Sequence, residues 1–206
     1  MEDKKIITRI LKLDKDIYNE LLVIPNSLQR SLAIFVTTSV LVTLSIHKFF
    51  GNVIKFFEDN IPILSEVTPK EELDIIRLLI EDLKLFYSET SSISVLTTNV
   101  LTYITSSAIG TFIVFFILKY LFRKEPSFRN IVIIFCFSSI PGFLSLPILF
   151  LSSLFLQGII LVFISIYSFI TFGSGMKQVY MLRNIEVILL IVAITFGSSL
   201  LSSFQL

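Results

Sequence analysis

Residues 130–176 read NIVIIFCFSSIPGFLSLPILFLSSLFLQGIILVFISIYSFITFGSGM, and this run of 47 residues contains no charged side chain. A helix that crosses a bilayer needs about 20 apolar residues. The run is therefore too long for one transmembrane helix and has the length of two helices joined by a tight turn. We place the two helices at 131–150 and 154–172, with the turn at 151–153. This stretch decides the fold class, because one soluble core of this chain length could not bury it.

The composition of the whole chain agrees with an integral membrane protein. Of its 206 residues, 54% are hydrophobic and 16% are charged, and the mean hydropathy is +0.86. Soluble domains have about 45–50% apolar and about 25% charged residues. The net charge of +1 offers no basic surface for nucleic acid. The segment MEDKKIITRILKLDKDIYNE at the N-terminus mixes acids with bases and has no long apolar core, so we expect no cleavable signal peptide.

Further apolar segments complete the expected bundle. We predict an all-α integral membrane protein with five transmembrane helices and one amphipathic extramembrane helix between the first and second spans. Residues 1–26 form a cytoplasmic leader and residues 27–206 form the five-span membrane domain. The spans are placed at about 27–46, 93–118, 131–150, 154–172 and 185–202, and the amphipathic segment at 47–90.

The distribution of Lys and Arg predicts the orientation of the chain, because cytoplasmic loops carry an excess of these residues. The N-terminal segment through Arg30 carries six of them, the segment between the second and third spans carries four, and the segment after the fourth span carries two. Segment 47–90 carries five, against nine acidic residues. We therefore expect a cytoplasmic N-terminus and an outer C-terminus, in a bacterial inner membrane or a thylakoid.

A helix start is visible within the amphipathic segment. Thr68 suits an N-cap, Pro69 suits the first helical position, and Glu71 completes a capping box. Apolar residues then recur at spacings of three and four, which predicts a single stripe on one helix face. The stripe consists of Leu73, Ile76, Ile80, Leu83 and Tyr87. It has two interpretations: the helix packs on its own bundle or in the headgroup region, or the stripe docks a partner protein.

Side chains that carry chemistry are scarce in the predicted spans. Ionisable groups inside a membrane are costly and usually mark function, and none lies in the central part of a span. Glu186 lies at the edge of the last span, where Arg183 can pair with it. His47 is the only histidine, and Cys136 suits packing in an apolar helix. We expect no catalytic, metal-binding or cofactor-binding residues, and hence no enzyme and no proton pump.

Proline, glycine and serine residues within the spans predict local features of packing. Pro141 and Pro147 interrupt an apolar span, so we expect a kink there rather than a straight helix. Gly142 would let a neighbouring helix approach the bend closely. In the second span, the pair Ser106 and Gly110 has the spacing of a close helix contact.

Two stretches are similar to a known family. The segment LKLDKDIYNELLVIPNSLQRSLAIFVTTSVLVTL, residues 11–44, resembles the entry of the prokaryotic-type branch of the Yip family, the Ypt-interacting membrane proteins. In that family, a leader of the form Leu-Asp-x-x-aromatic-x-Glu precedes a proline turn and a first span rich in small residues. The matching positions are Asp14, Tyr18, Glu20 and Pro25.

The second stretch, residues 126–194, is similar to the last three spans of the same family. Phe137 and Pro141 occupy the Tyr and Pro positions of its Gly-Tyr-x-x-x-Pro pattern, and Cys136 stands where the glycine would be. The Tyr-Gly-Pro signature of eukaryotic members is absent before the first span, and 47–90 matches no family motif that we can name. The resemblance implies five spans and a role in membrane organisation or trafficking, and it brings no catalytic residue.

Three functional hypotheses remain open. The first is a non-enzymatic membrane protein that acts through protein partners as a scaffold, adaptor or membrane-organising protein. The second is an accessory subunit of a larger membrane complex, possibly an energy-converting one. The third is a transporter or channel for a neutral or lipidic substrate. The partners that we expect are membrane lipid, membrane proteins or further copies of the same chain.

Overall fold

The computed structural model describes residues 3–90 and 93–202, and within these residues it contains helices and no strands. The prediction of an all-α protein is therefore confirmed. The α-helices are α1 (Asp3–Leu11), α2 (Ile17–Val23), α3 (Ser27–Val67), α4 (Lys70–Thr90), α5 (Ile93–Phe116), α6 (Phe128–Phe137), α7 (Leu154–Tyr180) and α8 (Asn184–Ser202). A π-helical turn, η1 (Ile117–Leu121), follows α5, and a 3₁₀ helix, η2 (Ile140–Leu149), follows α6.

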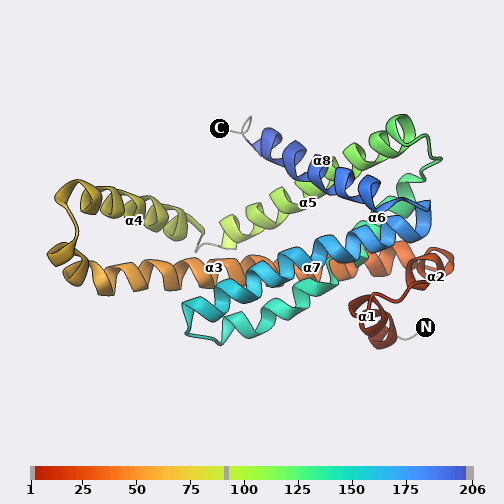
Figure 1. Cartoon of the computed structure of the whole chain (residues 1–206). Coiled ribbons are helices and arrows are strands. Elements are labelled where there is room, and N and C mark those ends of the chain that lie inside the picture. Colours follow the sequence, from red (N-terminus) through yellow and green to blue (C-terminus); the bar gives the residue numbers. More distant parts are fainter. Residues whose placement is uncertain (1–2, 91–92, 203–206) are drawn as a thin grey trace.

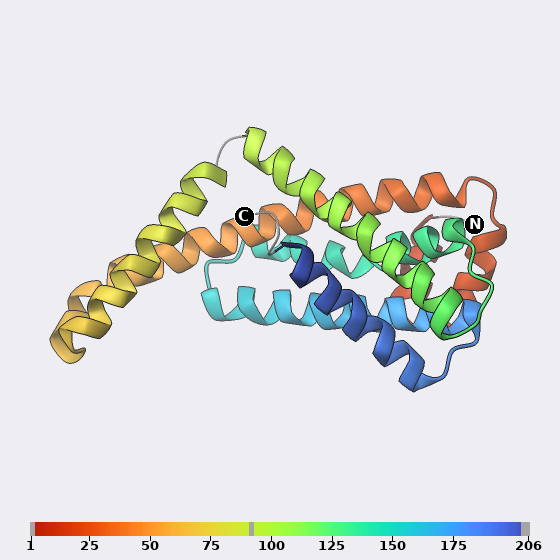
Figure 2. The ribbon, with the colours of Figure 1, turned by 90° about the horizontal axis from the view of Figure 1, so that it is seen from above.

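The helices form one bundle from which a long hairpin extends (Figure 1). Helices α6 and η2 lead to the turn at 151–153, and α7 runs back beside them. Helix α3 lies along this pair, and α5 and α8 cross over the bundle next to each other, as Figure 2 shows. Helix α4 folds back along the outer part of α3. The short helices α1 and α2 pack at the end of the bundle where α7 finishes.

Four segments are long and apolar enough to cross a membrane. They cover Ser27–Glu66, Val100–Leu121, Phe128–Leu149 and Leu154–Tyr180. The described apolar part of α8 covers Asn184–Phe196 and is shorter than these four segments. The multi-pass character of the chain is thus confirmed, and the fifth span stays a prediction.

Helix α3 is longer than the first predicted span. It continues without a break from Ser27 to Val67 and has 41 residues, which corresponds to about 62 Å at 1.5 Å per residue. The hydrocarbon core of a bilayer is about 30 Å thick, so about half of α3 can lie outside it. The polar residues His47 and Lys48 do not break the backbone hydrogen bonds of the helix, which continues past them. The helix ends only after Pro62, where the Thr68 amide donates to the carbonyl of Leu64.

The leader is a packed part of the fold. Ile6, Ile10, Ile17, Tyr18 and Leu21 are each at most 1% exposed and belong to the same hydrophobic cluster as the inner faces of α6 and α7. Leader and bundle therefore share one core, although the sequence gives them different polarity.

The segment with the two prolines changes its helix type. Helix α6 ends at Phe137, and after Ser138 and Ser139 the chain continues as the 3₁₀ helix η2, with Pro141 in its first turn and Pro147 inside it. The amide of Gly142 donates to the carbonyl of Ser139 at 2.7 Å. The sequence predicts a kink at this place, and the structure contains no straight α-helix through 135–150. A 3₁₀ helix of ten residues is unusually long, so its backbone needs support from neighbouring helices.

Candidate functional site

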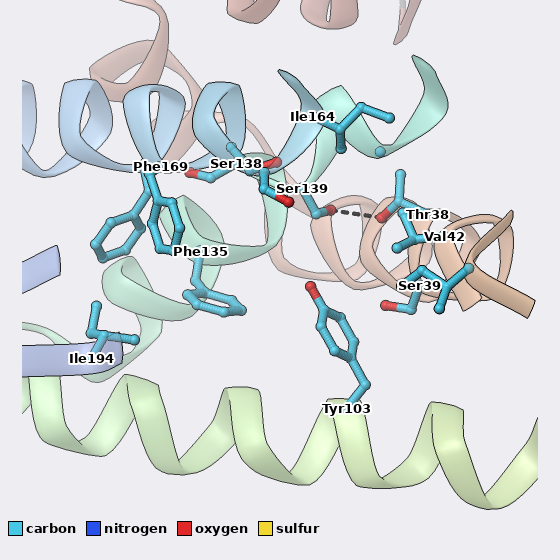
Figure 3. Close-up of a pocket in the computed structure, with 15 residues that line it drawn as sticks. Thr38, Ser39, Val42, Tyr103, Phe135, Ser138, Ser139, Ile164, Phe169 and Ile194 are labelled. Carbon is cyan, nitrogen blue, oxygen red and sulfur yellow. Dashed lines mark hydrogen bonds between the residues drawn. The ribbon is translucent and has the colours of Figure 1, made fainter. Parts of the chain in front are cut away.

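A cavity of about 320 Å³ lies inside the bundle, between α3, α5, the junction of α6 with η2, α7 and α8 (Figure 3). Its polar lining consists of hydroxyl groups alone. They come from Thr38, Ser39, Tyr103, Ser138, Ser139, Ser165 and Ser168. The remaining lining residues are apolar, apart from the glycine of η2. None of the side chains that line the cavity carries a charge at neutral pH.

Most of these hydroxyls bond within the protein. Ser39, Ser138 and Ser165 donate to carbonyls four residues earlier in their own helices, as serine in apolar helices commonly does. Thr38 also reaches across to Ser139 at 2.8 Å, the contact drawn in Figure 3. This bond ties α3 to the start of η2.

Two lining hydroxyls differ from the others. The Tyr103 hydroxyl and the Ser168 Oγ make no hydrogen bond within the described part of the chain. Figure 3 shows Tyr103 reaching from α5 into the space between Phe135 and Ser39, with its hydroxyl at the cavity. These two groups can still donate hydrogen bonds to a molecule inside.

Aromatic rings pack together at the side of the cavity where Tyr103 lies, and Phe135 and Phe172 among them line it. Phe35 stacks on Tyr103 with ring centroids 5.6 Å apart and meets Phe135 edge to face at 5.8 Å. Phe135 in turn contacts Phe172 at 6.0 Å. The rings connect α5, α3, α6 and α7, and such pairs contribute about 0.5–1.5 kcal/mol each beyond burial of area. These contacts hold together the four helices that surround the cavity on this side.

The 3₁₀ helix receives its support from three side chains of neighbouring helices. Thr171 donates to the carbonyl of Ser138 at 3.0 Å, and Ser45 donates to that of Ser145 at 3.1 Å. Gln157, which is fully buried, donates to the carbonyls of Ile148 and Leu151 and accepts from Asn52. Backbone groups without partners are costly in an apolar environment, and these donors satisfy them.

Sequence reasoning missed Gln157, Asn52 and Thr38. The signal for Gln157 was present, since it is the only glutamine in the uncharged run 130–176 and a buried amide must be hydrogen-bonded. No pattern in the sequence pairs these three residues with their partners, because those partners lie about 100 residues away, or at the end of η2 and in the turn after it.

The residues predicted to permit close packing have different environments. At Gly142, an added Cβ would lie 3.1 Å from the Thr38 Cβ and 3.2 Å from a methyl group of Val42, so η2 and α3 are in close contact there. At Gly110, the nearest atom would be 3.6 Å away on α8, which is an ordinary contact. Ser106 is exposed on α5, and Pro147 is exposed whereas Pro141 is buried.

The apolar stripe of α4 faces α3 of the same chain. Leu73 and Ile80 are buried, and Ile76 and Leu83 are half-buried. Tyr87 lies outside the residues whose side chains the structure describes. Lys84 pairs with Glu58 of α3 at 2.6 Å and closes the hairpin. Leu73 and Ile80 are thus covered within the chain, and docking of a partner on the stripe stays a prediction.

Another row of α4 remains exposed. Ile75, Leu78 and Leu79 are between 57% and 61% exposed. Their spacing places them together on one face of the helix, away from the stripe.

The leader is held by a compact polar cluster outside the spans. Arg9 pairs with Asp14 at 2.7 Å and makes two bonds to Glu20, at 2.5 and 2.8 Å. The hydrogen bonds from the guanidinium hold the pKa values of both carboxyls below their usual range. Gln178 of α7 donates to the carbonyl of Asp14 and accepts from the amide of Tyr18.

Other ionisable or reactive residues have structural roles. Arg183 pairs with Glu186 at 3.1 Å, as the sequence predicts. Cys136 is buried and free, and His47 is half-buried within α3. Among the described residues, no group of three or more His, Cys, Asp or Glu side chains could hold a metal ion.

These observations define the class first: a multi-pass helical membrane protein with a packed N-terminal leader. The chain belongs to the Yip family, since the Yip1 domain matches residues 9–204. No curated protein and no solved structure matches the chain significantly. The family match also includes 47–90, where sequence reasoning found no motif, and the prokaryotic-type branch stays a prediction.

The leader residues that carry the family resemblance meet in the structure. Asp14 and Glu20 share Arg9, and Tyr18 is buried with its hydroxyl 3.4 Å from the Ser138 Oγ. Ser138 belongs to the second stretch of resemblance. The two stretches therefore contact each other at the junction of α6 with η2.

Proposed function

We propose that the protein acts through protein partners, as a non-enzymatic scaffold, adaptor or membrane-organising protein. The observation that carries this proposal is the exposed apolar row of α4, formed by Ile75, Leu78 and Leu79. Yip family proteins are membrane proteins that interact with other proteins, and this row offers a surface for such an interaction.

The position of the row favours a protein over lipid. Helix α4 contains six acidic and three basic residues and is not among the segments able to cross a membrane. An acidic helix is repelled by the anionic headgroups that attract basic amphipathic helices. An apolar face on a helix outside the bilayer is stabilised by contact with another apolar surface. One face of α4 already contacts α3, and the exposed row is available for a second contact.

The topology that supports this proposal has the hairpin on the non-cytoplasmic side. The leader, the loop that contains Arg123 and the turn that contains Arg183 gather at one end of the bundle, opposite the turn at 151–153 (Figure 1). Because Lys and Arg are enriched in cytoplasmic loops, the end of the bundle with the leader would face the cytoplasm, and the hairpin would lie on the other side. A bacterial inner membrane or a thylakoid would suit this orientation.

The test is the capture of partners in a mild detergent. In the double variant Ile75→Asp with Leu79→Asp, we expect co-purifying proteins to be lost. Burying two carboxylates in an apolar contact carries a desolvation cost that opposes binding. Arg77→Glu changes the net charge of α4 by the same amount outside the row and should retain capture. Unchanged capture by the double variant would refute the role of the row.

An accessory subunit of a larger membrane complex would use the same surface. Stoichiometry distinguishes an accessory subunit from a scaffold or adaptor, since a subunit co-purifies with a fixed set of chains in a constant ratio. A scaffold or adaptor would instead bring down partners in ratios that vary with expression. Mass spectrometry of the crosslinked complex, with quantification of each chain, separates the two.

A further inference from the structure

We propose that the cavity between α3, α5 and α7 binds the head of an uncharged glyceride, a mono- or diacylglycerol, which enters from the bilayer. This inference does not depend on the proposed function, because the cavity and the exposed row of α4 lie on different parts of the molecule. The volume of about 320 Å³ is at the lower end of the range for small-molecule sites. It has room for a glycerol head and the beginning of an acyl chain, and the rest of the chain would stay in the bilayer.

The lining selects against charge. Every polar side chain in the cavity is a hydroxyl, and no lining residue could neutralise a phosphate or an ammonium group. A charged group that leaves water without a partner pays a large desolvation penalty. Phospholipid headgroups are therefore disfavoured, and an uncharged polar head is favoured.

The pattern of donors and acceptors narrows the class further. Tyr103 and Ser168 present hydroxyls that make no hydrogen bond within the described chain, so both can donate. The Ser39 Oγ already donates to Phe35, so toward a ligand it can accept. A glyceride matches this pattern, since its ester carbonyls accept and its free hydroxyl donates. A hydrocarbon matches none of it, and a sterol offers one hydroxyl only.

The cavity has a lateral entrance. Three of its lining residues are also on the outer surface of the bundle, namely Ile46 of α3, Tyr103 of α5 and Phe169 of α7, which are 38–46% exposed. All three lie within segments able to cross a membrane. The entrance therefore faces acyl chains, and a lipid can place its head inside without leaving the bilayer.

The frame is built to keep the cavity open. The bond from Thr38 to Ser139 and the contact between Gly142 and α3 fix one side. The chain of aromatic contacts that runs from Tyr103 through Phe35 and Phe135 to Phe172 fixes the other side of the cavity. The side chains of Ser138, Ser139 and Ser168 are small and leave space between the larger aromatic and aliphatic residues of the lining.

The test uses the full chain in phosphatidylcholine vesicles with a photoactivatable, clickable diacylglycerol. We expect crosslinked peptides from α3, α5 and α7. The double variant Tyr103→Phe with Ser168→Ala removes two donors with little change of shape and should lower labelling about fivefold or more. Thr105→Val removes a hydroxyl from the outer face of the same helix α5, where Thr105 bonds only its own helix, and should leave labelling unchanged.

A blocking variant covers the case in which the double variant fails to fold. Ser165 lines the cavity at its exposed edge, so Ser165→Phe should fold and should abolish labelling by occupying the entrance. Equal labelling of the double variant and the wild type would overturn the proposal. Equal labelling by a photoactivatable phosphatidylcholine, or stronger labelling by a sterol probe, would overturn it as well.

Discussion

Gly175 is the position where one added methyl group should disturb the fold most clearly. An added Cβ would lie 2.6 Å from the Ile134 Cγ2 and 3.0 Å from the ring of Tyr18. Gly175, Ile134 and Tyr18 come from α7, α6 and α2, and all three residues are buried. The glycine therefore allows the leader and α6 to pack on α7 at the same point.

The expected magnitude follows from two opposing effects. Overpacking in a well-packed core costs about 1–3 kcal/mol, and replacing a helical glycine by alanine gains about 1 kcal/mol in helix propensity. Because the new Cβ would lie only 2.6 Å from Ile134, we place the overpacking cost at about 2–3 kcal/mol, and we expect Gly175→Ala to lower the free energy of unfolding by about 1–2 kcal/mol. For a chain of this size, this corresponds to a Tm lower by about 2–8 °C.

The matched control is Gly110→Ala, on a different helix. There the nearest atom would be 3.6 Å from the new Cβ, with no clash. We expect Gly110→Ala to have an unchanged Tm or one raised by a few degrees, since the propensity gain is not opposed. Thermal unfolding in one detergent, followed by far-UV circular dichroism, measures both variants.

A double-mutant cycle tests whether the contact with Ile134 causes the loss of stability in Gly175→Ala. In the background Ile134→Ala, the penalty of Gly175→Ala should shrink, because the closest clashing atom is absent. The reasoning is wrong if Gly175→Ala is at least as stable as Gly110→Ala. It is also wrong if the penalty persists undiminished in the Ile134→Ala background.

Variants at three further positions test the polar contacts. Gln157→Leu should lower the free energy of unfolding by about 1–3 kcal/mol, seen as a lower Tm, because two backbone carbonyls lose their donor; an unchanged Tm would contradict the support of η2. Arg9→Met should make the leader more accessible to protease at neutral pH. In the wild type, the pKa values of Asp14 and Glu20, the two carboxylate partners of Arg9, are lowered. Their contribution to the stability of the leader is therefore present above about pH 4 and is lost as the pH falls through the lowered pKa values. Protease protection that is independent of both Arg9 and pH would show that this cluster does not hold the leader. Tyr18→Phe should change the Tm little, since its hydroxyl bond to Ser138 is 3.4 Å long, whereas Tyr18→Ala should cost about 3–5 kcal/mol; equal effects would show that the hydroxyl, not the ring, matters.

Sequence reasoning reached the class of the protein because that class depends on local composition. Uncharged runs longer than a bilayer is thick must lie in lipid or deep in a core, wherever the rest of the chain goes. The family resemblance likewise rested on short stretches, and the match over residues 9–204 confirms the family. The pair of Arg183 with Glu186 was predictable because the two residues are three positions apart at the start of α8.

The sites were harder to predict because their partners are distant in the chain. The stripe through Leu73 and Ile80 was visible, yet its periodicity could not say whether α3 or another protein would cover it. The α3 helix passes His47 and Lys48 without ending, because polar side chains can move a helix out of lipid but do not break its backbone hydrogen bonds. The change to a 3₁₀ helix at Ile140 required donors from other helices that no local pattern reveals.

The sequence by itself determined that this chain is helical, that it belongs in a membrane, and that its interior lacks charge, since each of these properties is a sum over neighbouring residues. Only the tertiary structure decided that seven hydroxyls line one cavity and that the Arg9 cluster holds the leader to α7. The physical reason is that such sites form from side chains far apart in sequence. Their positions depend on how five helical segments cross, and periodicity within one segment carries no information about that crossing.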